Sequence, residues 1–279
     1  MSEALVALLT ALGDDELVIG HRHSEWTGFA PHIEEDVAFS SIAQDEIGHA
    51  SAYYSIVANL TGDHPDRIAL GRQANEYRNA ILCERGNRDW SYTLARHWLY
   101  DTADEVRLES LENSSHPELA ALVTKLRREE RYHLIHARAW MTRIAHGPVE
   151  ARTRLIDSLT SAFPETHGLF EPFESESECV ERGWLPEASD ALRERWRSQA
   201  VAALDELGLP TDISAKRDEA AEFLASSSGD LIEKDTGADD GADAQASGIG
   251  GRRGRHTEEF DELWDVMTLT YRSHEGATW

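Results

Sequence analysis

Apolar residues recur at alternating steps of three and four through most of residues 1–147, and runs that alternate with a period of two are scarce. The first spacing places apolar side chains on one face of an α-helix, whereas the second would indicate strands. Turn-forming stretches interrupt the pattern at 26–31, 61–65 and 113–117, because Gly and Pro break helices. The pattern therefore predicts an all-α protein.

Between these interruptions we expect two pairs of long helices. The first pair covers about 2–24 and 32–60, and the second covers about 90–113 and 116–146. Short connections make each pair an antiparallel hairpin. Shorter helices are expected at about 66–84, 149–170 and 187–207.

Residues 226–251 are rich in Ser, Asp, Ala and Gly and nearly lack large apolar side chains, which predicts an acidic disordered linker. We therefore expect a helical bundle over 1–225 and a C-terminal helix over 252–279 that docks on the bundle or on a partner. The basic residues that begin this last segment, Arg252, Arg253 and Arg255, are expected to contact a partner or solvent, with a phosphate clamp as the alternative.

Each long predicted helix carries ionisable residues in the middle of its apolar stripe. Two helices have a Glu-x-x-His motif, in the stretches QDEIGH and EERYH, and residues at i and i+3 project to the same side of a helix. The other two helices have one carboxylate each. The six candidate metal ligands are Glu16, Glu46, His49, Asp101, Glu130 and His133.

Burial of so many ionisable groups costs several kcal/mol for each unless something compensates them. Two divalent metal ions would neutralise four carboxylates. One carboxylate from each of two helices, together with Glu-x-x-His from each of the other two, is the ligand set of ferritin-like di-iron and di-manganese bundles. The sequence leaves iron and manganese open, because Glu and His bind both.

The spacing of the acids supports this site more strongly than either motif alone, since a single Glu-x-x-His is close to chance. Glu46 follows Glu16 by 30 residues and Glu130 follows Asp101 by 29 (46 − 16 and 130 − 101). Both pairs are nearly symmetric about their loops, so antiparallel helices bring each pair to the same height. Glu105 lies one turn beyond Asp101 and is the alternative ligand on that helix.

Acids next to the motifs are expected to support the ligands. Asp45 and Glu129 directly precede the two motif glutamates and can orient the imidazole of a neighbouring ligand, with Glu105 as a third acid of this kind. The alternative to a metal site is a metal-free core in which the buried acids pair with residues of the fourth helix. The candidates for that pairing are Arg128, Arg131 and Tyr132.

Other histidines and tryptophans lie near the same helices. We expect the histidines to be surface or hydrogen-bonded core residues, with metal ligation as the alternative; they are His21, His23, His97 and His136. The tryptophans are expected to serve packing; they are Trp26, Trp90, Trp98 and Trp140.

The formal net charge of −25, from 52 acidic and 27 basic residues, argues against a nucleic-acid partner. Such an acidic surface with few lysines is typical of a halophilic protein. No apolar run is long enough to span a bilayer, and Glu3 stands where a secretory leader would be basic, so we expect a cytoplasmic protein without a membrane partner. Cys83 and Cys179 lack metal-type spacing and are expected to be reduced thiols.

Five stretches carry a family resemblance: EWTGFAP, QDEIGH, WLYD, REERYHLIHARAW and GGRRGRHTEEF. They resemble the phenylacetyl-CoA epoxidase (phenylacetate-CoA oxygenase) subunits of aromatic catabolism, over most of the chain outside 226–247. The overall frame resembles the C-type subunit, which is generally regarded as a scaffold. QDEIGH and EERYH nevertheless match the metal-binding motifs of the catalytic A-type subunit.

The resemblance implies a subunit of a multicomponent di-iron monooxygenase that activates O₂ and forms the ring 1,2-epoxide of phenylacetyl-CoA. It implies as partners an A-type subunit, a small B-type subunit and a separate flavin/iron–sulfur reductase that supplies electrons. No flavin or NAD fingerprint occurs in this chain. A structural subunit of the same complex and a ferritin-like iron-handling protein remain as alternatives.

Overall fold

The computed structural model describes residues 2–213 and 248–274, and no strand occurs in these two ranges. The predicted all-α class is confirmed. The longer helices are α1 (Glu3–Ser24), α2 (Ile33–Thr61), α5 (Trp90–Leu111), α6 (Pro117–Ala145), α7 (Val149–Ala162), α9 (Ser189–Glu206) and α12 (Glu258–Ser273). The short ones are α3 (Pro65–Leu70), η1 (Ala74–Glu76), α4 (Ile81–Glu84), η2 (Phe163–Phe170), α8 (Glu176–Glu181) and η3 (Gly251–Arg253).

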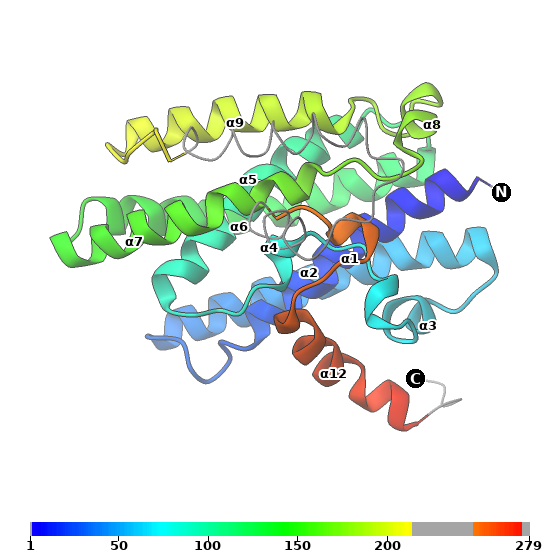
Figure 1. Ribbon diagram of the computed structural model, residues 1–279, viewed down its shortest axis with the longest axis horizontal. Coiled ribbons are helices and arrows are strands. Elements are labelled where there is room, and N and C mark those ends of the chain that lie inside the picture. The colour runs from blue at the N-terminus through cyan, green and yellow to red at the C-terminus, as the bar shows by residue number, and fades with distance from the viewer. Residues whose placement is uncertain (1, 214–247, 275–279) are drawn as a thin grey trace, which may run out of the picture.

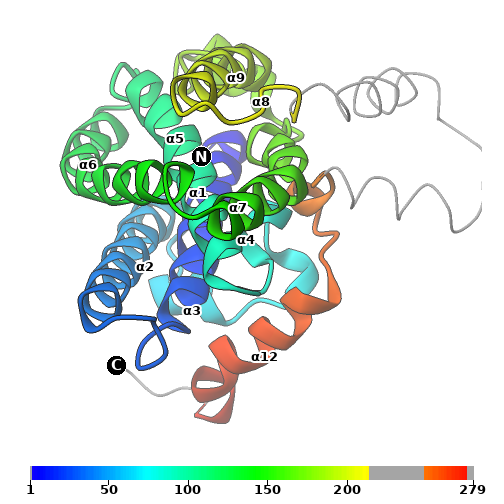
Figure 2. The same ribbon diagram turned by 90° about the vertical axis from the view of Figure 1, so that its left-hand side faces the viewer.

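Four long helices form the centre of the molecule (Figure 1). Helix α1 lies along α2, α5 lies along α6, and α2 faces α6, as the view along the helices in Figure 2 shows. Helices α7 and α9 pack against α5 from outside. The two predicted hairpins thus pair into a ferritin-like four-helix bundle with additional helices on one side.

Helices α1 and α2 approach each other closely because glycines of α1 face α2. A Cβ atom added at Gly20 would lie 2.9 Å from the Cβ atom of Glu46, and one at Gly13 would lie 2.9 Å from the ring of Tyr54. Both distances are shorter than real contacts of this kind. The absence of a side chain at Gly20 therefore sets how near α1 comes to the helix that carries Glu46.

The predicted helix at 66–84 is wrong. This segment forms α3, η1 and α4, with extended backbone between them. Two buried acids of α1 accept hydrogen bonds from its backbone: Asp14 Oδ2 from Arg78 N at 2.7 Å, and Asp15 Oδ1 from Ala80 N at 2.8 Å. A backbone N–H group that donates to a side chain of another helix cannot also donate to a carbonyl of its own segment, so an α-helix does not form there.

The predicted helix at 149–170 is wrong in its second half, where α7 gives way to the 3₁₀ helix η2 at Phe163. Pro164 lies at the start of η2 and has no N–H to continue the α-helical hydrogen bonds. The last predicted helix corresponds to α12, which begins at Glu258 after the short 3₁₀ helix η3.

The residues from 248 to 274 pack on the bundle. Arg252, which we expected at a surface or partner contact, is instead buried, and its guanidinium binds both carboxylate oxygens of Asp15 at 2.8 and 2.7 Å. Gly251 lies so close to Asn79 that a Cβ atom would overlap its carbonyl oxygen. Residues 248–251, assigned by composition to the linker, thus form a buried turn; residues 226–247 lie outside the described ranges.

Two minor features complete the fold. No helix in the described ranges is both long and apolar enough to cross a membrane. Cys83 and Cys179 are buried free thiols, and burial raises the pKa of both, that of Cys179 to about 12.

The buried ion pair between Arg252 and Asp15 should make the largest single contribution to the free energy that holds the C-terminal segment on the bundle. Replacing Arg252 with Ala leaves Asp15 with Arg107 as its remaining cationic partner, and loss of one member of a buried pair costs about 3 to 5 kcal/mol. We expect Arg252→Ala to lower the free energy of unfolding by this amount in urea denaturation. The control is exposed Arg255→Ala, and equal losses in the two variants would contradict the expectation.

Candidate metal centre

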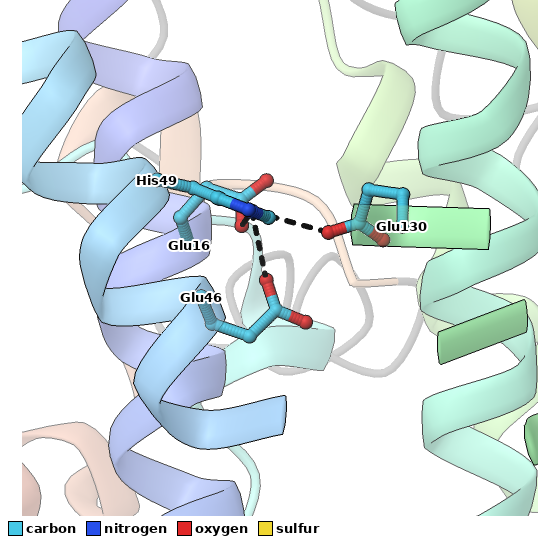
Figure 3. Close-up of side chains that lie close together, drawn as sticks. All are labelled: Glu16, Glu46, His49 and Glu130. Atoms are coloured by element: carbon cyan, nitrogen blue, oxygen red, sulfur yellow. Dashed lines mark ion pairs between the residues drawn. The ribbon is translucent and has the colours of Figure 1, made fainter. Parts of the chain in front are cut away.

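Four buried side chains from three helices meet in the middle of the bundle. Each of Glu16, Glu46, His49 and Glu130 offers a donor atom within 4.8 Å of the donor atoms of the others. Figure 3 shows Glu130 reaching across from α6 towards the His49 ring and Glu46 on α2, with Glu16 beside them on α1. The structure therefore brings together three of the four predicted carboxylates and one of the two predicted imidazoles as one group.

The second imidazole, His133, lies against the same carboxylates. Its Nδ1 is 3.3 Å from Glu130 Oε1 and 3.5 Å from Glu46 Oε1. His49 Nδ1 lies 3.1 Å from the same Glu130 oxygen and 3.4 Å from Glu16 Oε2. The two rings thus turn the same nitrogen towards a shared set of carboxylates, and these donor atoms together could hold metal.

The acids that precede the two motifs hold the other nitrogen of each ring, and they do so across the helix pair. Glu129 on α6 lies 3.0 Å from His49 Nε2 on α2, and Asp45 on α2 lies 3.3 Å from His133 Nε2 on α6. An ionised carboxylate only accepts hydrogen bonds, so each Nε2–H donates to it. This fixes the ring orientation and directs Nδ1 inwards, a common arrangement behind metal-binding histidines.

Asp101 lies beside this group on α5 and is buried. Its Oδ1 is 3.2 Å from His97 Nδ1, and it lines a pocket of ≈ 620 Å³ together with Glu130. Glu105 lines the same pocket but is half-exposed, and it pairs with Arg138 at 3.0 Å. The geometry therefore favours Asp101 over Glu105 as the α5 ligand, and Glu105 contacts neither imidazole in the structure.

The metal-free alternative lacks the partners that it requires. Arg128, Arg131 and Tyr132 are exposed, and in the described part of the chain they form no ion pair or hydrogen bond with the buried acids. Nine buried atoms around the centre make no hydrogen bond in the described part of the chain: Glu16 Oε2, both Glu46 oxygens, His49 Nδ1, both Asp101 oxygens, both Glu130 oxygens and His133 Nδ1. Such atoms are costly without a partner, and all are oxygen or imidazole donors suited to iron or manganese. The residues present therefore fit a pair of metal ions.

Without a metal, protons must neutralise the centre. Burial and the nearby charges of Glu16 and Glu130 raise the pKa of Glu46, and burial and Glu130 raise that of Asp101. Burial opposes protonation of His49, but Glu130 and Glu16 outweigh it and raise its pKa to about 12. The Glu130 carboxyl moves the other way: despite burial, His133 and His49 lower its pKa. Metal binding therefore has to displace protons.

The sequence pattern does not indicate one group that contacts the centre. Tyr100 on α5 is fully buried, and its hydroxyl donates to Glu16 Oε1 at 3.1 Å. It directly precedes Asp101, but on an ideal helix adjacent residues diverge by about 100°. Only the packing of α1 against α5 shows that both side chains reach the same site.

Fold and centre together define a class: a helical bundle with a buried carboxylate–histidine centre that could hold metal. The family model of the phenylacetic acid catabolic proteins matches residues 1–227, and the chain belongs to this family. It is 27% identical over 278 residues, 99% of each chain, to the C subunit of the 1,2-phenylacetyl-CoA epoxidase of Escherichia coli (strain K12). The predicted resemblance is confirmed at the level of the family.

The raised pKa of Glu46 predicts a pH dependence for the metal-free protein. The folded state binds this proton more tightly than the unfolded chain, whose Glu pKa is about 4.3. The stabilisation is therefore complete below that pH and is lost as the pH rises towards the folded pKa, by at most about 1.4 kcal/mol per pH unit. We expect chelator-treated wild type to lose stability relative to Glu46→Gln between about pH 5 and 8.

Urea denaturation at several pH values in chelator measures this difference. The matched control is Glu118→Gln, which replaces an exposed glutamate of α6 outside the centre. A constant difference for Glu46→Gln would show that Glu46 does not hold a proton in the folded protein.

Proposed function

We propose that this chain is a subunit of a phenylacetyl-CoA ring 1,2-epoxidase and that it holds a di-iron centre of its own. The observation that carries the metal assignment is the set of buried donor atoms without hydrogen bonds between α1, α2, α5 and α6. The likeness to the C subunit of an epoxidase supports the complex. The proposed ligands are Glu16, Glu46, His49, Asp101, Glu130 and His133.

A bound pair of iron ions would supply the redox chemistry that activates O₂ for oxygen transfer to the aromatic ring. The chain's own residues orient the ligands and control access. Glu129 and Asp45 fix the imidazoles, and Tyr100 holds one Glu16 oxygen.

The ≈ 620 Å³ pocket between α5 and α6 gives access to the proposed centre. Apolar Leu108, Leu134 and Ile135 form part of its wall, which suits an aromatic group, and arginines of α6 lie at its edge. These arginines suit a substrate that carries negative charge. Proposed partners are an A-type subunit, a small B-type subunit and a flavin/iron–sulfur reductase.

The assignment predicts a metal stoichiometry of about two iron ions per chain after anaerobic loading. Glu46→Ala and Asp101→Asn should each reduce this to about one ion or fewer, because each removes a proposed ligand. Glu105→Gln, one turn from Asp101 and half-exposed, is the matched control and should keep about two. Elemental analysis by plasma mass spectrometry measures the content, and wild type with fewer than about 0.5 iron per chain would refute the centre.

Activity separates a catalytic chain from a structural one. In the complex reconstituted with its partner subunits and reductase, Glu46→Ala should abolish O₂-dependent epoxidation of phenylacetyl-CoA. Full activity with this variant, in an assembled complex, would instead make the chain a structural subunit. Iron binding by wild type without epoxidation in any reconstituted complex would favour an iron-handling protein.

A further inference from the structure

Three side chains connect Asp101 with the outside of the bundle. His97 Nδ1 lies 3.2 Å from Asp101 Oδ1, and its Nε2 lies 3.3 Å from His136 Nδ1. His136 Nε2 in turn lies 2.8 Å from Glu35 Oε2. Each ring uses one nitrogen towards each neighbour, so the contacts form one unbroken chain from α5 through α6 to α2.

The inner part of this chain is shielded from water. His97 is fully buried, with the Phe39 ring centroid 5.3 Å and the His23 ring centroid 5.2 Å from its own. Phe39 also contacts the His136 ring, at 5.5 Å. Polar contacts in such surroundings are stronger than in water, because no solvent competes with them.

The outer end of the chain is anchored. Glu35 Oε2 also accepts a hydrogen bond from Trp140 Nε1 at 2.8 Å, and Glu35 lines a pocket of ≈ 550 Å³ with Trp140 and Arg143. Glu35, which belongs to α2, thus contacts two side chains of α6. The position of His136 is therefore fixed from both sides.

Asp101, like Glu46 and Glu130, is a proposed ligand whose carboxylate oxygens make no hydrogen bond in the described ranges. The two imidazoles have their own acids, Asp45 and Glu129, and Glu16 has Tyr100. Neither oxygen of Asp101 makes a hydrogen bond within the described ranges, and His97 Nδ1, 3.2 Å away, also makes none. A carboxylate terminus rotates broadly about its last torsion, so a partner on one oxygen decides where the other points.

We propose that His97 is a positioning residue for Asp101 and that His136 and Glu35 hold His97 in place. The proposal rests on the metal centre proposed above. A carboxylate bound to a cation can only accept hydrogen bonds, so His97 Nδ1–H donates to Asp101, and the Nε2 of the neutral His97 ring accepts from His136 Nδ1–H. The chain thereby couples the α5 ligand to α2 and α6, the helices of the two motifs.

Two substitutions at His97 separate its two contacts. Asn places an amide near the position of Nδ1 and can keep the contact with Asp101, whereas Gln places it near Nε2 and keeps the contact with His136. The probe is Co(II) alone, whose affinity is measured against a competing chelator and whose ligand-field absorption reports coordination. We expect His97→Gln to weaken binding of one of the two ions by about 10- to 100-fold and to change its absorption, and His97→Asn to stay within about threefold of wild type.

The control is His146→Gln, an exposed histidine at the C-terminal cap of α6, which should bind Co(II) as wild type does. Thermal melting of the metal-free proteins tests whether each variant folds. If His97→Gln does not fold, the Co(II) affinity is measured instead for Glu35→Gln, His136→Gln and His136→Asn. Each of these is expected to bind Co(II) more weakly than wild type. Wild type that binds no Co(II) would refute the metal centre itself. If wild type binds two ions, two results would overturn the positioning role alone. One is a Co(II) affinity of His97→Gln equal to that of wild type, and the other is an equal loss of affinity in both His97 variants.

Discussion

The structure depends on how three consecutive acids of α1, Asp14, Asp15 and Glu16, are compensated in the interior. Asp14 binds Arg72, and Asp15 binds Arg107 and Arg252. Burial of these carboxylates is tolerable because guanidinium groups and backbone N–H groups satisfy them.

Glu16 differs from its two neighbours, because no Arg or Lys reaches it in the described ranges and it faces Glu46, Glu130 and His49 instead. Ion pairs account for Asp14 and Asp15 as structural residues. They do not account for Glu16. This contrast within a single helical turn distinguishes Glu16, as a member of the candidate metal centre, from its structural neighbours.

The same acids explain why the fold departs from a plain four-helix bundle. By accepting backbone N–H groups of residues 78 and 80, Asp14 and Asp15 hold the segment between η1 and α4 in extended form. Arg252 reaches Asp15 from the far end of the sequence, so the C-terminal segment stabilises the helix that carries Glu16. The support of the candidate centre therefore includes described residues from both the first helix and the C-terminal segment.

The sequence by itself determined the all-α class, the two hairpins and the six candidate ligands, because helical spacing and symmetry about each loop are local properties. Tertiary structure decided that Asp45 and Glu129 each serve the imidazole of the opposite helix. It also showed that Asp101 is buried beside the cluster whereas Glu105 pairs with Arg138, and that Arg252 binds Asp15, because these features depend on contacts between residues far apart in the sequence. The periodicity of one helix shows which face is buried, but only packing shows which group of another helix lies opposite it.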